Sequence, residues 1–303
     1  MKDYNTNADI SQEQKLFHKL AIKKAYNKPV IEYLRAVHEP DRADRVFHCG
    51  EHIGITTIDG VAKIVKADFC RERLCAVCAW RRQAKFTAQT FPILSILARR
   101  GYEFIFVTLT IANMKYDRLE GAVDALLRGY ALLRKRRSVK RSWAGIIRSL
   151  ELTYNADSNT FHPHLHLLVA VPREYFVNRD LYITQGQLAD MWADCIGTDY
   201  IPVCHIEKVK GDTTAAAVET IKYALKPTDA KQAFSAFFFI LRGRRLISFC
   251  GVFAKLRREL KYSDFENILT DDVDTRRSIT YNLYTFDATG GVYRFNNTYT
   301  LER

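Results

Sequence analysis

Three histidines alternate with other residues near the middle of the chain, at His162, His164 and His166, and the run continues as Leu167-Leu168-Val169. Successive side chains of a β-strand point to opposite faces, so this spacing predicts a strand with imidazoles on one face and apolar residues on the other. His164 and His166 then stand roughly 6.5 Å apart along the strand, close enough for both to reach one cation. The segment therefore predicts a β-sheet with a metal site on one face.

A predicted turn at residues 156–159 joins the histidines to a preceding strand at 146–154. Antiparallel pairing about this turn places Glu151 directly opposite His164 and on the same face. Glu151, His164 and His166 form a candidate metal site, and two imidazoles with one carboxylate suit Mn²⁺ or Mg²⁺, although Zn²⁺, Co²⁺ or Fe²⁺ can bind the same donors. Two alternatives stay open at this point: a polar surface strand without a metal, and a non-haem iron oxygenase.

Hairpins and helices are mixed along the middle of the chain. The predicted elements are, in order, strand 104–110, helix 118–133, strands 146–154 and 161–171, helix 185–194, strand 203–209 and helix 213–225. This order predicts an α+β fold, with a central antiparallel β-sheet and helices packed on its faces, and it disfavours parallel doubly wound folds. No Gly-Lys-Ser or Gly-Lys-Thr occurs, so a Walker A motif is missing and ATP-driven translocation by this chain is not expected.

Cysteines are concentrated in residues 46–79, which hold four of the seven. The four are Cys49, Cys70, Cys75 and Cys78. Four closely spaced thiolates are the ligand set of a closed structural Zn²⁺ site, so this segment is predicted to be a small zinc-binding module. His48 and His52 flank the first cysteine and either can replace it as a ligand, while packing of free cysteines as small hydrophobes remains an alternative. The scattered Cys195, Cys204 and Cys250 are expected in the core.

A tyrosine on the predicted helix 213–225 suggests a second reactive group. Glu219 and Tyr223 are four residues apart and Lys226 follows three residues later, so the three side chains share one helix face. A phenol with a pKa near ~10 needs a nearby cation or base to act as a nucleophile. The stripe is therefore a candidate catalytic group, whereas half-buried packing is the simpler alternative for a helical tyrosine.

Basic residues outnumber acidic ones, with 46 Lys and Arg against 34 Asp and Glu and a formal net charge of +12. A basic run follows the helix at 118–133 and contains Arg134, Lys135, Arg136, Arg137, Lys140 and Arg141. These side chains can track DNA phosphates, or they can be a solvated helix end. No apolar run approaches the ~20 residues of a membrane span and the N-terminus lacks a signal sequence, so we expect a cytoplasmic protein with no membrane partner.

Taken together, these segments resemble the three ordered motifs of the HUH endonucleases: Thr108-Leu109-Thr110 on a strand, Glu151 ahead of the histidines, and Glu219 through Tyr223 to Lys226. More closely, the chain resembles the Rep_1-type plasmid rolling-circle replication initiators, which carry a single catalytic tyrosine. The resemblance covers roughly residues 46–229 and includes the cysteine spacing. One departure is Ala76, where relatives commonly carry proline.

The resemblance implies a metal-dependent DNA nickase and strand transferase built on an HUH-type palm. Tyr223 would attack a phosphodiester at a plasmid origin, single-stranded or in a hairpin, to form a 5′-phosphotyrosine. Lys226 would lower the cost of the phenolate, and Glu219 would activate water at termination. The implied partners are origin DNA and a host helicase and polymerase, with a homodimer left open. An HUH transposase or relaxase, and a zinc-dependent DNA-binding protein without catalysis, are kept as alternatives.

The same reasoning divides the chain into four parts. We predict a helical N-terminal segment at 1–45, the zinc-binding module at 46–79, the endonuclease domain at 80–229 and a C-terminal extension at 230–303. The last part carries no motif that the resemblance explains, and its role is not predicted.

Overall fold

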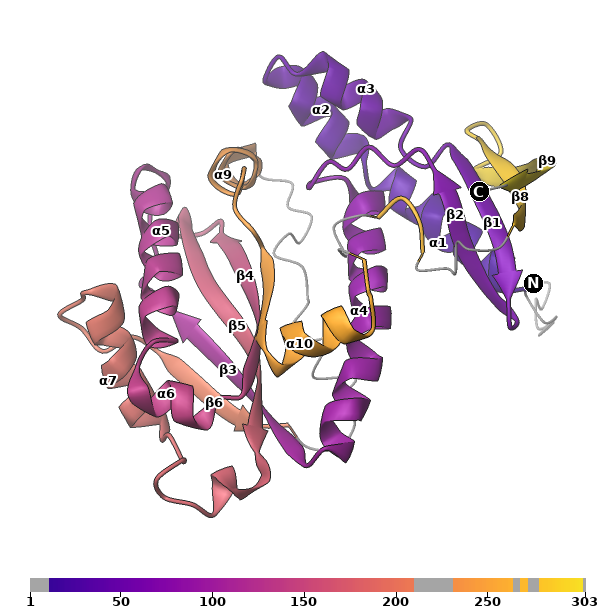
Figure 1. Cartoon of the computed structure of the whole chain (residues 1–303). Coiled ribbons are helices and arrows are strands. Elements are labelled where there is room, and N and C mark those ends of the chain that lie inside the picture. Colours follow the sequence, from indigo (N-terminus) through magenta and orange to yellow (C-terminus); the bar gives the residue numbers. More distant parts are fainter. Residues whose placement is uncertain (1–10, 210–230, 264–267, 272–277, 302–303) are drawn as a thin grey trace, which may run out of the picture. The chain divides into compact units, whose positions relative to one another are not determined.

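The computed structural model describes residues 11–209, 231–263, 268–271 and 278–301 (Figure 1). The chain divides into two compact units, one made of residues 1–85 and 263–303 and the other of residues 86–262. The boundary between them falls within a single helix, α4 (Ala76–Arg99). Among the described residues, no helix combines the length and the apolar character needed to cross a membrane.

Five described strands of unit 86–262 form an antiparallel sheet in the order β6-β3-β5-β4-β7. The strands are β3 (Tyr102–Thr110), β4 (Gly145–Asn155), β5 (Thr160–Pro172), β6 (Cys204–Lys208) and β7 (Ile247–Gly251). Strand β5 is central and carries the histidines. Leu165, Leu167 and Val169 alternate with them and are fully buried, as the pattern of the strand predicts.

One face of this sheet is covered by a layer of helices. The helices are α5 (Tyr116–Leu133), α6 (Arg137–Ser142) and α7 (Gln185–Ile196), and the short η1 (Arg173–Phe176) follows β5. Buried residues of α5 recur at helical spacing, as Leu119, Val123, Leu126, Tyr130 and Leu133 show. A reciprocal capping box of Thr184 and Gln187 begins α7, and Gly197 in the left-handed conformation ends it.

The other face of the sheet carries the histidines and is packed differently. Helix α10 (Val252–Glu259) packs against β4 and β7 on this face, whereas α9 (Lys231–Ile240) contacts α5. Phe253 of α10 contacts Phe104 of β3 with ring centroids 6.3 Å apart, and Phe86 of α4 stacks on Phe249 of β7 at 5.3 Å. These rings lie at the end of the face that is farther from the histidines. Phe249 pairs with Ile147, which lies four positions before Glu151 on β4.

A second antiparallel sheet, in the order β2-β1-β8-β9, belongs to the unit of residues 1–85 and 263–303. It consists of β1 (His52–Ile58), β2 (Val61–Ala67), β8 (Ile279–Asp287) and β9 (Val292–Leu301), and the unit also contains α1 (Gln12–Ala25), α2 (Lys28–Ala36) and α3 (Pro40–Phe47). Phe17 of α1 packs against Tyr284 and Tyr293 of the sheet. The ring of Tyr281 packs directly against Gly54, where a Cβ would lie only 2.6 Å from that ring.

The α+β fold class is confirmed, and so is the register of the central hairpin, in which Glu151 pairs with His164. Two features differ from the sequence-based expectation. Residues 247–251 form strand β7, which is not among the elements predicted for the middle of the chain. The region 230–303 also splits, because β7 pairs with β4 while β8 pairs with β1. The predicted helix 213–225 lies outside the described residues.

Candidate functional site

The candidate metal site is built by three neighbouring strands of the sheet in unit 86–262. His164 of β5 lies between Glu151 of β4 and Thr110 of β3, and His166 lies between Ser149 of β4 and Thr108 of β3. Even-numbered residues of β5 share a face, so both imidazoles project to the same side as Glu151. The structure therefore brings together the three residues that the sequence selected.

The three side chains converge on a single point. Nε2 of His166 lies 2.9 Å and Nε2 of His164 lies 3.3 Å from the same carboxylate oxygen, Oε2 of Glu151. One ligand atom from each residue lies within 4.8 Å of the others. The Glu151 and His164 side chains are 11% exposed and the His166 side chain 18%, so the cluster is shielded while one side remains accessible.

Neighbouring groups orient both imidazoles through their Nδ1 atoms. Nδ1 of His164 lies 3.1 Å from the carbonyl oxygen of His162, which can only accept, so Nδ1 donates there and Nε2 faces Glu151. Nδ1 of His166 lies 3.2 Å from the hydroxyl of Thr108. Contacts of this kind on the outer nitrogen fix ring orientation and tautomer in metal-binding histidines. The geometry thus fits a divalent cation held by Nε2, Nε2 and a carboxylate oxygen.

Electrostatics keep the carboxylate of the cluster ionised. Burial acts to raise the pKa of Glu151, but hydrogen bonds with His164 and His166 outweigh it and lower that pKa to about 2. Burial and the neighbouring His164 lower the pKa of His162, which favours its neutral form. A charged oxygen beside two imidazole nitrogens is a donor set that can hold Mn²⁺, Mg²⁺ or another divalent ion, and the donors alone do not select among them.

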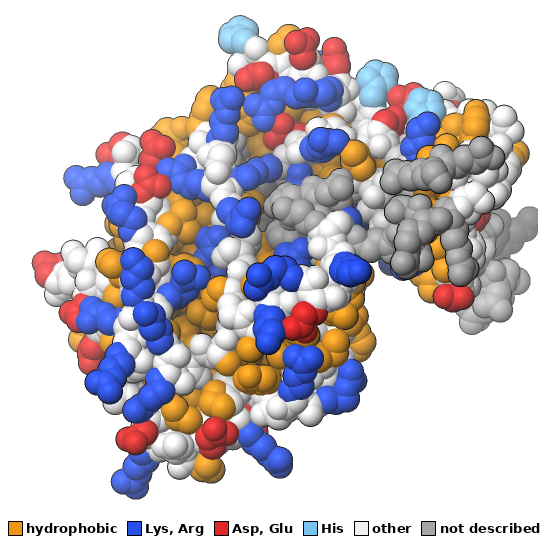
Figure 2. Space-filling view, in the orientation of Figure 1, with side chains coloured by type: hydrophobic (Ala, Val, Ile, Leu, Met, Phe, Trp, Pro, Cys, Tyr) orange, Lys and Arg blue, Asp and Glu red, His pale blue; other side chains and the backbone are white. Residues whose placement is uncertain are grey.

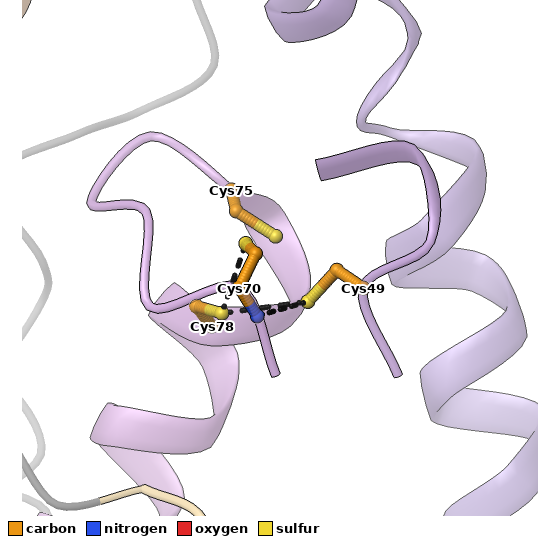
Figure 3. A group of neighbouring side chains, drawn as sticks. All are labelled: Cys49, Cys70, Cys75 and Cys78. Atoms are coloured by element: carbon orange, nitrogen blue, oxygen red, sulfur yellow. Dashed lines mark hydrogen bonds between the residues drawn. The ribbon is translucent and has the colours of Figure 1, made fainter. Parts of the chain in front are cut away.

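The four predicted zinc ligands also cluster, near the start of α4 (Figure 3). Their sulfur atoms lie within 4.8 Å of one another. Sγ of Cys78 is 3.5 Å from Sγ of Cys49 and 3.5 Å from Sγ of Cys70. The backbone N–H of Cys70 donates to Sγ of Cys49 at 3.4 Å. Cys49, Cys75 and Cys78 are fully buried, and the group can bind Zn²⁺ with four thiolates.

The two histidines considered as substitutes for Cys49 point elsewhere. Nδ1 of His48 lies 2.6 Å from Oε2 of Glu51, and Nδ1 of His52 lies 3.1 Å from Oδ2 of Asp68. Both imidazoles are at least half exposed. The geometry therefore favours Cys49 as the fourth member of the cluster.

Sequence reasoning missed one residue that supports the cysteine cluster. The side-chain amide of Asn27 donates to Sγ of Cys75 at 3.3 Å, and its oxygen accepts from the backbone N–H of Ala76 at 2.7 Å. Burial opposes ionisation of Cys75, but hydrogen bonds from the other three thiols outweigh it and lower the pKa of Cys75. Asn27 lies 48 residues before Cys75, so no local sequence pattern connects the two.

Replacing Cys75 with serine is expected to release the zinc and to lower the thermal midpoint of the unit that holds it. A structural zinc contributes its binding free energy to folding, and a hydroxyl is a far poorer zinc ligand than a thiolate. Elemental analysis should show about one Zn per chain in the parent protein and much less in the variant. Cys204→Ser is the matched control, because Cys204 is also buried but lies outside the cluster. A parent protein that holds no tightly bound zinc would contradict this prediction.

The basic run forms an exposed surface between α5 and α6. Lys and Arg side chains line the corresponding region in Figure 2. Three members have partners: Nη2 of Arg136 lies 3.3 Å from Asp194, Arg141 donates to the carbonyl oxygen of Asp180, and the guanidinium of Arg134 lies 5.4 Å from the centre of the Tyr130 ring. The run belongs to the helix layer on the face opposite the histidines. A role in binding DNA stays a prediction.

The remaining predictions concern the scattered cysteines and the tyrosine stripe. Cys195 and Cys204 are buried, as expected, while Cys250 is half-buried. Tyr223, Glu219 and Lys226 lie outside the described residues, so their catalytic roles stay predictions.

The chain is similar to known replication proteins. The family model Rep_1, described as a replication protein, matches residues 61–290. "Protein rep" of Streptococcus pneumoniae serotype 2 (strain D39 / NCTC 7466) is 33% identical over 235 residues, which cover 74% of this chain and 73% of that protein. "Protein rep" of Lactiplantibacillus plantarum is 32% identical over 263 residues, covering 81% and 83%. No solved structure gives a significant match.

Proposed function

Because the chain belongs to the Rep_1 family of replication proteins, we propose that it initiates plasmid replication by nicking one DNA strand at the origin and rejoining that strand at termination. The observation that carries the proposal is the convergence of His164, His166 and Glu151 on one point of the sheet. A replication protein that only bound DNA would not need such a cluster.

The proposed roles of the cluster follow from its geometry. When bound, a divalent cation supplies Lewis-acid polarisation of a phosphate oxygen and neutralises charge that develops there. Glu151 stays ionised over the whole physiological pH range because its pKa is about 2. The Nδ1 contacts of His164 and His166 hold Nε2 of each ring toward the same point, so little reorganisation is needed when the substrate arrives.

Tyr223 is the proposed nucleophile. Its phenolic oxygen loses a proton and attacks the scissile phosphorus, so that a phosphotyrosine bond forms as the P–O3′ bond breaks, and the departing oxygen takes up a proton to become a free 3′-OH. Lys226 favours the phenolate by its charge. The phosphotyrosine conserves the energy of the phosphodiester, so resealing needs no ATP, in keeping with the missing Walker A motif.

Glu219 is assigned a later step. It is proposed to activate water or a second nucleophile at termination, since it precedes Tyr223 by four residues in the sequence. The free 3′-OH primes synthesis by a host polymerase, and a host helicase opens the duplex. The basic run Arg134–Arg141 is proposed to contact DNA phosphates and to add salt-dependent affinity without reading the sequence.

The test is a covalent adduct. Single-stranded DNA that spans the plasmid origin is incubated with the zinc-loaded protein and Mn²⁺, and the products are separated in SDS. We expect a protein–DNA band that resists SDS and disappears after protease treatment, together with a free 3′-OH fragment. A protein that binds this DNA tightly and forms no adduct or nick would instead be a DNA-binding protein without catalysis, and the proposal would fall.

A further inference from the structure

A pocket of about 540 Å³ lies in unit 86–262 at the end of the sheet where the β4–β5 hairpin turns. It is lined by Lys115, Tyr116, Asp117, Asn159, Phe161, Ser235 and Phe239. These residues come from the hairpin, the beginning of α5 and helix α9, which lie at the same end of the unit in Figure 1. The volume falls in the range of small-ligand sites. Nothing in the metal chemistry described above uses this pocket.

Aromatic rings dominate the pocket. Phe161 is 1% exposed and forms its floor, while Tyr116 and Phe239 are 44% and 49% exposed. The ring centroid of Phe161 lies 6.3 Å from that of Tyr116 and 4.9 Å from that of Tyr154. Two large rings half open to solvent beside a buried third ring form a surface that suits stacking with a flat, partly polar ring.

Backbone hydrogen bonds fix part of the pocket lining in place. Met114 and Phe161 exchange two backbone hydrogen bonds, at 2.8 and 2.7 Å, which tie the segment before α5 to β5. The side-chain oxygen of Asn159 accepts from the hydroxyl of Tyr154 at 2.9 Å, so the amide NH₂ of Asn159 is the group that can donate to a ligand. A fixed aromatic floor with a directed donor at its edge is a binding site formed in advance, which lowers the entropy cost of binding.

The pocket and the metal cluster share strand β5. Phe161 precedes His164 by three residues on the same strand, which is about 10 Å along β5. Helix α9, which supplies Ser235 and Phe239, follows in sequence the segment that contains Tyr223. Phe161 is odd-numbered, so its ring lies on the α5 side of the sheet, opposite the histidines, and a DNA strand whose scissile phosphate lies at the histidines reaches this pocket by passing around the end of the sheet.

We propose that this pocket binds an unpaired nucleobase of the single-stranded DNA substrate, by stacking on Tyr116 and Phe239 and by a hydrogen bond from Asn159. The proposal rests on the proposed function, because that function brings single-stranded DNA to this end of the sheet. Lys115, exposed at the rim, is placed to meet the phosphate of the same nucleotide. The site holds one substrate base in place while the neighbouring phosphate reacts.

The test measures binding of homopolymeric single-stranded oligonucleotides without added divalent metal, since stacking tolerates any base and no cleavage is required. Tyr116→Ala and Phe239→Ala are each expected to weaken binding roughly 10-fold, within the range that loss of one base stack produces. Tyr116→Phe, which keeps the ring, should bind like the parent. Tyr182→Ala is the matched control, because Tyr182 is equally exposed at 44% in the same unit but lies outside the pocket.

A second measurement reports stacking directly. An oligonucleotide with 2-aminopurine in place of one base should lose fluorescence on binding the parent protein and keep it with Phe239→Ala. Alanine variants that remain folded by circular dichroism and bind the probes like the parent would overturn the pocket, even if the parent nicks origin DNA. Conversely, a parent that binds and quenches the probe but never nicks would retain the pocket and remove the proposed function.

Discussion

Tyr223→Phe is expected to abolish both nicking and the covalent adduct, while origin-DNA binding stays within a few-fold of the parent value. The change removes only the hydroxyl, which is the group proposed to form the phosphotyrosine bond. A single hydroxyl contributes little to an interface dominated by phosphate contacts. A time course of adduct formation on labelled single-stranded origin DNA, with binding measured in parallel, tests both statements. An adduct that persists in this variant would move the nucleophile to another tyrosine.

In the same assay, Glu219→Ala distinguishes the first attack on the DNA from release of the adduct at termination. If Glu219 activates the second nucleophile, this variant should form the adduct at the parent rate and release it slowly, because loss of a general base typically costs ~10²–10⁴-fold in the step that it serves. The expected trace is therefore an adduct that accumulates and decays little. Equal loss of the first nick in Glu219→Ala and Tyr223→Phe would show that Glu219 instead helps to deprotonate the tyrosine.

The metal cluster could be predicted because every step was local. Alternation fixed which side chains of β5 share a face, and a short turn fixed the register that sets Glu151 opposite His164. A shift of one residue in that register would have moved Glu151 to the opposite face. The cysteine cluster was predictable for a similar reason, since three of its four members lie within nine residues of one another.

Features that depend on distant partners could not be predicted. Strand β7 lies at the edge of the sheet and pairs with β4 about 100 residues earlier, so its short sequence reads equally well as part of a basic helix. The contact of Asn27 with Cys75 and the pairing of β8 with β1 are also long-range. Thr108 and His166 are 58 residues apart and lie on different strands. The sequence therefore does not reveal that the Thr108 hydroxyl reaches Nδ1 of His166.

The cluster of Glu151, His164 and His166 gives the second large expected effect. His166→Ala and Glu151→Gln should each reduce nicking by ~10²-fold or more and weaken binding of Mn²⁺, because the first removes one of three donors and the second replaces an anionic oxygen donor with a neutral amide, at a site with no described substitute. The side chains project from a sheet face and do not build its apolar core, so the folded state should persist. Electron paramagnetic resonance of Mn²⁺ added to zinc-loaded protein measures the metal affinity separately from activity.

Two further variants on the same strands distinguish ligands from their surroundings. His162→Ala should leave Mn²⁺ affinity within a few-fold, since His162 lies two residues from His164 on the same face but is not part of the convergent group. Thr108→Val keeps the shape of the side chain and removes the hydroxyl at Nδ1 of His166, and groups in that position typically change metal affinity by ~10- to 100-fold. The expected order of Mn²⁺ affinity is therefore parent and His162→Ala highest, Thr108→Val intermediate, and His166→Ala and Glu151→Gln lowest. A His166→Ala variant that nicks origin DNA at the parent rate in Mn²⁺ would show that these three residues do not hold the catalytic cation.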